Sequence, residues 1–200
     1  MPASASLRDV IGLDNTLPRL ATATLLMIDF QNTYRTGVMA LDGVEPALAA
    51  GARLLAAARS AGTPVVHVVN DGGEGTPYDI RAEIGAISPE VAPAGGEPVV
   101  VKGFPDAFHG TDLEQVLRDL GAETDLVVAG FMTHMCVTFT AQGAFHRGYR
   151  PTVVAEATAT RSLRAPDGST VPAATLQTGS LTIIGDLFGT VAPTVGHLAG

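Results

Sequence analysis

Short apolar runs alternate along the chain with longer segments in which apolar residues recur every three or four positions. The runs are too short and too continuously apolar to form amphipathic helices, and they predict strands that are buried on both faces. Such strands are predicted at 24–28, 64–69, 98–101, 126–130 and 151–154.

Helices are predicted in the segments between these strands. The apolar positions of 113–120 recur at helical spacing and indicate a helix that ends before Gly121. Thr111 and Glu114 have the spacing of a capping box at the start of this helix. Further helices are predicted at 45–60, 136–147 and 173–187, with an edge strand near residue 190.

Strands that alternate with helices predict a parallel sheet covered on both faces. We therefore expect one α/β domain over residues 1–200, a doubly wound three-layer α/β/α fold whose mostly parallel sheet has about six strands. Residues 1–20 predict an irregular N-terminal arm that lies on the body or on a neighbouring subunit. Residues 71–98 are rich in Gly, Pro and acids and predict a long loop with one helical turn at 79–84.

Three reactive side chains follow the ends of predicted strands. Asp29 follows the first strand, Lys102 follows the third, and Cys136 follows the fourth after a short turn, near the start of a helix. In open α/β sheets, ligands bind outside the carboxyl ends of the strands, near the point where the strand order reverses. We therefore expect these three residues to meet at one edge of the sheet.

Each of the three residues also has a simpler interpretation. An Asp at a strand end often forms a turn, a lone Lys before Gly is usually solvated, and a single Cys is often a buried apolar residue. The shared edge of the sheet favours a functional interpretation of all three.

Composition and charge exclude several classes of protein. The formal net charge is -8 at pH 7, with no basic stripe, so nucleic acid is a poor candidate partner. No secretory signal and no apolar run of about 20 residues is visible, which predicts a cytoplasmic protein that does not bind membranes. The single cysteine cannot form an internal disulfide.

Several motifs, in the right order and spacing over about residues 24–159, resemble the isochorismatase-like cysteine hydrolases. This superfamily includes nicotinamidases and N-carbamoylsarcosine amidases. The resemblance is carried by residues 28–32, 101–102, 107–108, 111–113 and 130–137.

The resemblance implies a catalytic triad of Asp29, Lys102 and Cys136. It also implies a non-proline cis peptide bond between Phe131 and Met132, with the backbone N–H groups of Met132 and Cys136 forming an oxyanion hole. Because relatives commonly associate, we expect a homo-oligomer, a dimer or larger.

The implied reaction is cleavage of an amide or cyclic amide C–N bond of a small molecule through a thioester on Cys136. Asp29 would accept the thiol proton, and Lys102 and the helix start would lower the pKa of the thiol below its usual value of about 8.5. Residues 76–79 and 131–136 look most like the branch that includes streptothricin hydrolase, which opens a cyclic amide.

Two other functions stay open on the sequence. One is an isochorismatase-type vinyl ether hydrolase, which needs no thiol. The other is a non-catalytic binding or redox protein that uses Cys136 as an oxidisable thiol.

No cofactor and no metal are expected. Metal-binding nicotinamidases hold their ion with an Asp and closely spaced His residues after the second strand. Here Asp71 is present, but no histidine lies between His67 and His109.

The pocket is expected to be lined by aromatic residues, by residues of the 71–98 loop and by a histidine beside the cysteine. We expect His134 to be a pocket wall rather than the base of a Cys-His pair, because neighbours at i and i+2 in a tight turn point apart. The full set of predicted substrate-binding residues is Phe30, Tyr34, Asn70, Asp71, Phe104, Phe108 and His134.

Overall fold

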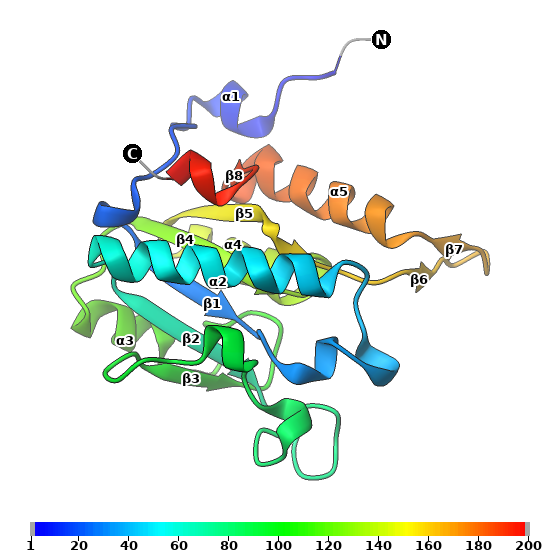
Figure 1. The fold of residues 1–200 in the computed structure, drawn as a ribbon. Helices are drawn as coiled ribbons and strands as arrows, with labels where there is room; N and C mark the ends of the chain where they lie inside the picture. The colour runs from blue at the N-terminus through cyan, green and yellow to red at the C-terminus, as the bar shows by residue number, and fades with distance from the viewer. Residues whose placement is uncertain (1–2, 199–200) are drawn as a thin grey trace.

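A six-stranded parallel sheet forms the middle layer of the computed structural model, which describes residues 3–198 (Figure 1). Its strands are β1 (Thr24–Ile28), β2 (Val65–Asn70), β3 (Val99–Lys102), β4 (Asp125–Phe131), β5 (Arg150–Ala159) and β8 (Thr190–Ala192). They lie in the order β3-β2-β1-β4-β5-β8, and all neighbours are parallel. The predicted doubly wound sheet is confirmed.

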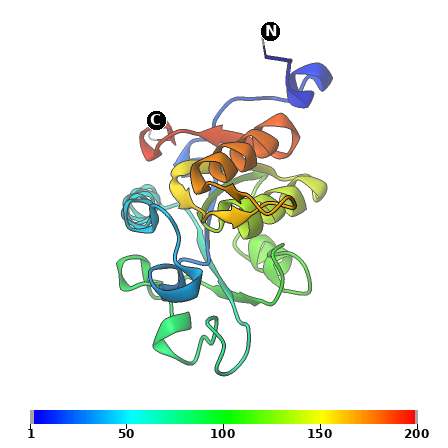
Figure 2. The ribbon, with the colours of Figure 1, turned by 90° about the vertical axis from the view of Figure 1, so that its right-hand side faces the viewer.

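Helices cover both faces of this sheet, which confirms the predicted three-layer architecture. α2 (Val44–Ala61) lies on one face, and α3 (Leu113–Asp119), α4 (Thr138–His146) and α5 (Ala173–Ile183) lie on the other (Figure 2).

The β1 strand shows why its sequence is apolar throughout. All its residues are buried: Leu25 and Met27 pack in the core under α2, and Leu26 and Ile28 pack in the core under α3 and α4. Alternate side chains of a strand point to opposite faces, so a strand covered on both sides needs apolar residues at every position.

The strand order reverses between β1 and β4. The chain builds β1, β2 and β3 outward in one direction and then returns to place β4 on the other side of β1. The two strands approach so closely that a Cβ on Gly130, whose φ is 134°, would lie 1.8 Å from the carbonyl oxygen of Ile28. The carboxyl ends of β1 and β4 are thus held together at the point where such sheets bind ligands.

The N-terminal segment contains regular structure that the sequence analysis missed. A short helix, α1 (Leu7–Ile11), begins at Ser6, whose side chain and that of Asp9 form a capping box. It contacts the segment after α5 through a hydrogen bond from the Leu7 N–H to Asp186 at 2.9 Å. A helix of five residues is too short to show a hydrophobic period, so the prediction of an irregular arm was wrong here.

Two local predictions around the loops were also wrong. The capping box expected at Thr111 does not form: the N-cap residue is Asp112, and the Thr111 hydroxyl accepts from the Leu113 N–H at 3.2 Å and donates to the Ala107 carbonyl oxygen at 2.6 Å. The helical turn expected at 79–84 is replaced by 3₁₀ turns at Glu83–Gly85 and Pro89–Val91.

Three boundaries differ from the prediction. The helix expected from residue 136 is preceded by a π-helical turn, Thr133–Val137, and the helix expected to reach 187 ends in a second one, Ile184–Phe188. The β5 strand continues to Ala159, because its second half pairs with the end of β4 after a register shift.

An antiparallel hairpin of β6 (Leu163–Arg164) and β7 (Thr170–Val171) follows β5 and was not predicted. Within residues 3–198, no helix is both long and apolar enough to cross a membrane.

Candidate active site

The carboxyl ends of three strands bring Asp29, Lys102 and Cys136 together. Asp29 directly follows β1, Lys102 is the last residue of β3, and Cys136 lies in the π-helical turn after β4. The Lys102 Nζ atom lies 2.7 Å from Asp29 Oδ2 and 3.2 Å from Cys136 Sγ. One ammonium group therefore contacts both the carboxylate and the sulfur.

The backbone at Asp29 is held in an unusual conformation. Its φ is 51°, and it is the one non-glycine residue with a positive φ in the described part of the chain. The Asp29 N–H donates to the Val68 carbonyl oxygen at 2.8 Å, and its own carbonyl oxygen accepts from the Gln31 N–H at 2.7 Å. Backbone strain of this kind persists only where surrounding contacts enforce it, and it is common at active sites.

The cluster is almost closed to solvent. Exposed fractions are 0% for Asp29, 2% for Lys102 and 7% for Cys136. Burial raises the pKa of Asp29, and the Lys102 ammonium opposes this rise. Burial also works against the charge on Lys102, but the Asp29 carboxylate and the Cys136 sulfur outweigh it and raise the pKa of Lys102.

The prediction of a lowered thiol pKa was wrong. Burial, followed by the negative charge of Asp29, raises the pKa of Cys136 to about 12, and the nearby Lys102 only partly offsets these effects. The resting site therefore holds a neutral thiol beside an ion pair. Cys136 does lie in the turn before α4, where a helix start would lower the thiol pKa. Burial of the cysteine outweighs this effect.

Lys102 has a third contact, with Asn70, which the sequence analysis predicted as a substrate-binding residue. Its Nζ donates to Asn70 Oδ1 at 3.2 Å, from the neighbouring end of β2. Asn70 is in turn held by Gln31, which is 0% exposed and was not predicted as a site residue. Its only signal in the sequence is an amide two residues after Asp29.

Aromatic side chains pack beside the triad. The Tyr34 ring centroid lies 5.7 Å from that of Phe131 and 5.8 Å from that of Tyr78. Burial raises the pKa of Tyr34 well above its usual value, and the negative charge of Asp29 adds to the rise. Tyr78, from the loop between β2 and β3, was missed because a lone aromatic in an irregular loop has no periodic pattern.

Within residues 3–198, no hydrogen bond joins His134 to Cys136. Its Nδ1 forms a short hydrogen bond with Thr160 Oγ1, at the end of β5. Burial, with the positive charge of Arg161, lowers the pKa of His134, so that the ring is neutral at pH 7. The structure thus favours a wall or structural role over a Cys-His pair.

Arg161 is a second residue that the sequence analysis missed. It follows Thr160 at the same edge of the sheet and is partly buried, and its Nε atom has no hydrogen-bond partner among the described residues. One contact of the guanidinium is a hydrogen bond from Nη1 to the Val38 carbonyl oxygen at 3.3 Å. The salt bridges found in residues 3–198 include none to Arg161, which leaves an unpaired cation near the site.

The predicted phenylalanines lie in different surroundings. Phe30 packs in the core, with its ring centroid 4.8 Å from that of Phe131. Phe108 is also buried, and its ring stacks on Tyr149 at 6.0 Å. Phe104 is 57% exposed on the surface and contacts His109. A substrate-binding role for these three rings stays a prediction.

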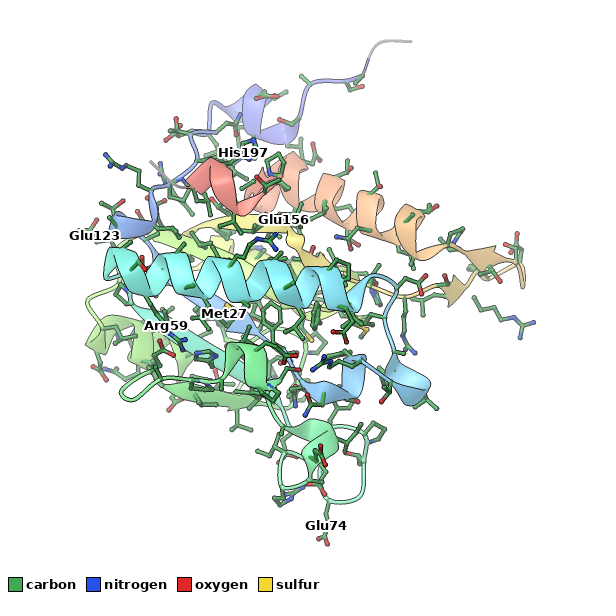
Figure 3. All side chains as sticks on the ribbon, viewed as in Figure 1. Met27, Arg59, Glu74, Glu123, Glu156 and His197 are labelled. Atoms are coloured by element: carbon green, nitrogen blue, oxygen red, sulfur yellow. The ribbon has the colours of Figure 1, made fainter. Side chains whose placement is uncertain are left out.

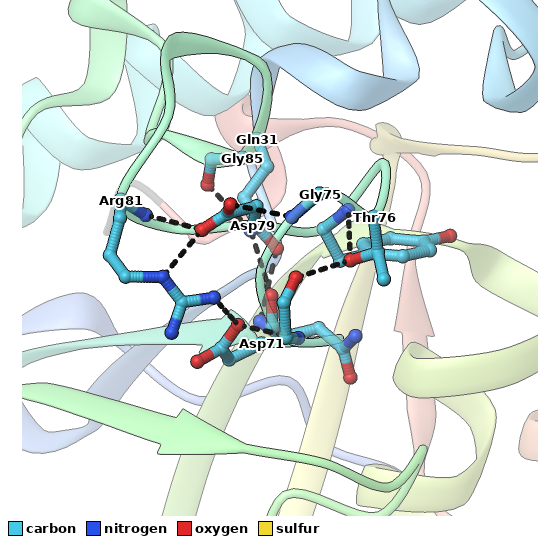
Figure 4. Close-up of polar contacts among 10 residues, drawn as sticks. Gln31, Asp71, Gly75, Thr76, Asp79, Arg81 and Gly85 are labelled. Carbon is cyan, nitrogen blue, oxygen red and sulfur yellow. Dashed lines mark hydrogen bonds and ion pairs between the residues drawn. The ribbon is translucent and has the colours of Figure 1, made fainter.

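The β2–β3 loop (residues 71–98) is stiffened by its own polar groups. Asp79 accepts hydrogen bonds from the Gly75 N–H at 2.9 Å and from Arg81 Nε at 2.7 Å, and Arg81 Nη2 lies 3.4 Å from Asp71 Oδ1 (Figure 4). Glu74 lies at the exposed tip of the loop, away from the sheet (Figure 3). Asp71 is thus engaged within the loop itself.

No group of three or more His, Cys, Asp or Glu side chains between residues 3 and 198 is arranged to hold a metal ion. His67 is buried, and its Nε2 lies 2.9 Å from Glu97 Oε2.

The peptide bond between Phe131 and Met132 is cis, as the resemblance to the cysteine hydrolases implies. Met132 directly precedes the π-helical turn, and Cys136 is its fourth residue.

Comparisons with known proteins agree with this geometry. The family model of the isochorismatase domain matches residues 23–179. An uncharacterized isochorismatase family protein of Bacillus subtilis is 36% identical over 180 residues, which cover 88% of this chain and 99% of that protein. The crystal structure of an isochorismatase from Pseudomonas putida KT2440 has a TM-score of 0.92 and 38% identity, and the alignment covers 97% of this chain and 99% of that one.

Two relatives carry the names of specific enzymes. A streptothricin hydrolase of Streptomyces noursei is 35% identical over 164 residues, covering 81% of this chain and 65% of that enzyme. A maleamate amidohydrolase of Pseudomonas putida is 36% identical over 155 residues, covering 66% of this chain and 70% of that enzyme.

Proposed function

The chain belongs to the isochorismatase family, and on this premise we propose that it is a cysteine amidohydrolase that cleaves a C–N bond of a small molecule. The observation that carries the proposal is the position of the Lys102 ammonium, 2.7 Å from the Asp29 carboxylate and 3.2 Å from the Cys136 sulfur. The names of two relatives, a maleamate amidohydrolase and a streptothricin hydrolase, support hydrolysis of an amide.

Because the resting thiol is neutral, proton transfer must accompany attack. The Asp29 carboxylate lies 2.7 Å from the Lys102 ammonium, and a side-chain hydrogen bond between Asp29 and Cys136 affects the pKa of both groups, which puts the carboxylate within reach of the thiol proton. In the proposed step the Cys136 sulfur bonds to the carbonyl carbon while its proton passes to Asp29. Lys102 remains charged, and it stabilises the sulfur as negative charge develops there.

The carbonyl oxygen becomes an oxyanion in this step. We assign its stabilisation to the backbone N–H groups of Met132 and Cys136, at the turn after β4. Fixed donors of this kind contribute more to catalysis in a dry site than in water, because they need no reorganisation as charge develops.

Collapse of the tetrahedral intermediate breaks the C–N bond. The proton held by Asp29 passes to the leaving nitrogen, and a thioester remains on Cys136. A water molecule then attacks the thioester with Asp29 as general base, and the carboxylic acid product leaves as the thiol regains its proton. The elevated pKa of Asp29, caused by burial, suits a group that must repeatedly take and return a proton.

Arg161 supports a narrower assignment, an amide that also carries an acidic group. The guanidinium has a buried Nε without a partner, and its charge acts on the pKa of both His134 and Tyr78. A carboxylate could occupy this position and accept two parallel hydrogen bonds. Maleamate, which names one relative, combines a carboxylate with an amide.

The two alternatives have less support. A vinyl ether hydrolase would need no thiol beside the Asp29–Lys102 pair. A redox-sensing thiol should be accessible and acidic. Cys136 is neither, because it is 7% exposed and its pKa is raised to about 12. A cytoplasmic location and a homo-oligomer stay predictions.

Intact-mass analysis with maleamate and with a matched neutral amide tests the function. Wild type should show a transient acyl adduct that is absent from Cys136→Ala, whose turnover should fall by about 10⁴-fold or more. Its free energy of unfolding should change by no more than about 1 to 2 kcal/mol, because one small side chain is lost.

Arg161→Met tests the narrower assignment. It should raise KM for maleamate at least tenfold more than for the neutral amide, the cost of one charge-assisted hydrogen bond (about 1.4 kcal/mol). Full turnover by Cys136→Ala would contradict the proposed chemistry, whereas equal effects of Arg161→Met on both amides would contradict only the acidic substrate.

A further inference from the structure

The segment that follows Asp29 is paired with the returning limb of the β2–β3 loop. Gln31 forms an antiparallel bridge with Ile87, and the Ser88 N–H donates to the Phe30 carbonyl oxygen at 2.8 Å. The residues around the catalytic aspartate and the loop over the site are therefore parts of one hydrogen-bonded unit.

Gln31 has a special place in this unit because both the nitrogen and the oxygen of its amide are hydrogen-bonded. Its Nε2 donates to the Gly85 carbonyl oxygen at 2.7 Å and to the Asn70 carbonyl oxygen at 3.0 Å, and its Oε1 accepts from the Asn70 N–H at 3.0 Å (Figure 4). Both backbone groups of Asn70 are thus fixed by one side chain. The Asn70 side chain holds the Lys102 ammonium at 3.2 Å.

We propose that Gln31 is a positioning residue that ties the β2–β3 loop to the Lys102 ammonium through Asn70. When the loop is docked, Gly85 and Asn70 are held by the same amide, and Asn70 keeps Lys102 against the Cys136 sulfur. When the loop lifts, Gln31 loses its bond to Gly85, and the hold on Asn70 and Lys102 weakens. Lys102 is therefore held firmly against the Cys136 sulfur only while the loop is docked.

A purely structural role is the alternative, because a buried glutamine with three hydrogen bonds also stabilises the fold. The chain offers a matched control in the next residue. Asn32 also anchors the loop, with its Nδ2 donating to the Glu83 carbonyl oxygen and its Oδ1 accepting from Ser88 at 2.9 Å each. Within residues 3–198, no hydrogen bond or ion pair joins Asn32 to Asn70 or Lys102, so Asn32 reports loop anchoring alone.

The experiment compares Gln31→Met with Asn32→Ala in the full chain, below the melting temperature of each variant. Iodoacetamide labelling of Cys136 at pH 9 is the first readout, because the thiolate fraction depends on the position of Lys102. Loosening of the loop should change access to the thiol in both variants. We expect Gln31→Met to label about tenfold more slowly than Asn32→Ala, a shift of about one pKa unit at the thiol.

A second variant guards against failure of Gln31→Met to fold. Asn70→Ala removes the last contact in the relay and should slow labelling by a similar factor. Gln115→Met, on the exposed surface of α3, controls for the substitution itself and should label as wild type does. Equal labelling of Gln31→Met and Asn32→Ala, or wild-type labelling of Asn70→Ala, would overturn the proposal.

Turnover gives a second readout that rests on the proposed amidase function. Gln31→Met should lower kcat at least tenfold, whereas Asn32→Ala should mainly raise KM. Labelling needs no substrate, so the two proposals can fail separately: a wild type that hydrolyses no amide leaves the labelling test of Gln31 intact.

Discussion

Two carboxylate–cation pairs, one buried at the sheet edge and one exposed on the β2–β3 loop, differ in the pKa shift of their acids. The Asp29–Lys102 pair has side chains that are 0% exposed, whereas Arg81 of the β2–β3 loop is 55% exposed where it contacts Asp79. In the buried pair, desolvation raises the pKa of the acid, and in the loop, backbone hydrogen bonds lower the pKa of Asp79. The same pairing therefore accompanies a raised acid pKa in one place and a lowered one in the other.

The largest effect should follow from breaking the buried pair. Lys102→Met leaves the Asp29 carboxylate in a dry site without its partner, which should lower the free energy of unfolding at pH 7 by about 3 to 5 kcal/mol. With the partner gone, the folded-state pKa of Asp29 lies still further above its unfolded value. The protonated form then favours folding, so the loss should shrink as the pH falls from 7 toward 5.

Urea unfolding at both pH values measures this effect. The double variant Lys102→Met with Asp29→Asn serves as the control and should recover much of the lost stability, because no buried charge remains. A pH-independent loss in Lys102→Met would show that packing, rather than charge, holds the pair together.

A smaller effect concerns the reactivity of the thiol. Because the charge of Asp29 raises the pKa of Cys136, Asp29→Asn should increase the rate of iodoacetamide labelling at pH 8 by about tenfold, while it abolishes turnover. Asp71→Asn, on the exposed loop, is the matched control and should label at the wild-type rate. Slower labelling of Asp29→Asn would mean that the carboxylate activates the thiol even without a substrate.

The exposed pair should matter little for stability. Arg81→Ala removes the contacts to Asp79 and Asp71, but solvent-exposed pairs contribute at most about 1 kcal/mol each. We expect a change within that range in thermal unfolding and a change of a few-fold in KM. A loss of more than about 2 kcal/mol would show that the loop network is as important as the buried pair.

Chelation should have no effect at all. The proposed mechanism gives a metal ion no step, since the nucleophile is a sulfur and the oxyanion is met by backbone N–H groups. Turnover before and after exhaustive dialysis against EDTA measures this. Activity that is lost on chelation and restored by zinc, iron or manganese would contradict the proposal.

Strand ends were predictable because a buried parallel strand has a strong local signature. The apolar runs before Asp29 and Lys102 locate the carboxyl ends of β1 and β3 from sequence alone. Parallel strands deliver those ends to the same edge, so the meeting of the reactive side chains follows from the pattern.

Contacts made across the fold were not predictable in this way. The relay of Gln31, Asn70 and Gly85 joins residues 39 and 54 positions apart, and no period or motif marks such a set. The direction of the Cys136 pKa shift was also predicted wrongly, because a helix start is visible in the sequence but the burial of Cys136 is not. Arg161 was missed for a similar reason. The sequence shows an arginine, but it does not show that no acidic side chain in residues 3–198 forms a salt bridge with it.

Gly130 has a consequence for laboratory evolution of this enzyme. Every other amino acid would place a Cβ about 1.8 Å from the carbonyl oxygen of Ile28, the residue that immediately precedes Asp29. In a saturation library, position 130 should thus be empty of active clones, and Gly95, which has open space around it and no positive φ, should accept most side chains. Attempts to widen the pocket for new substrates will have to redesign the β2–β3 loop and leave the β1–β4 junction alone.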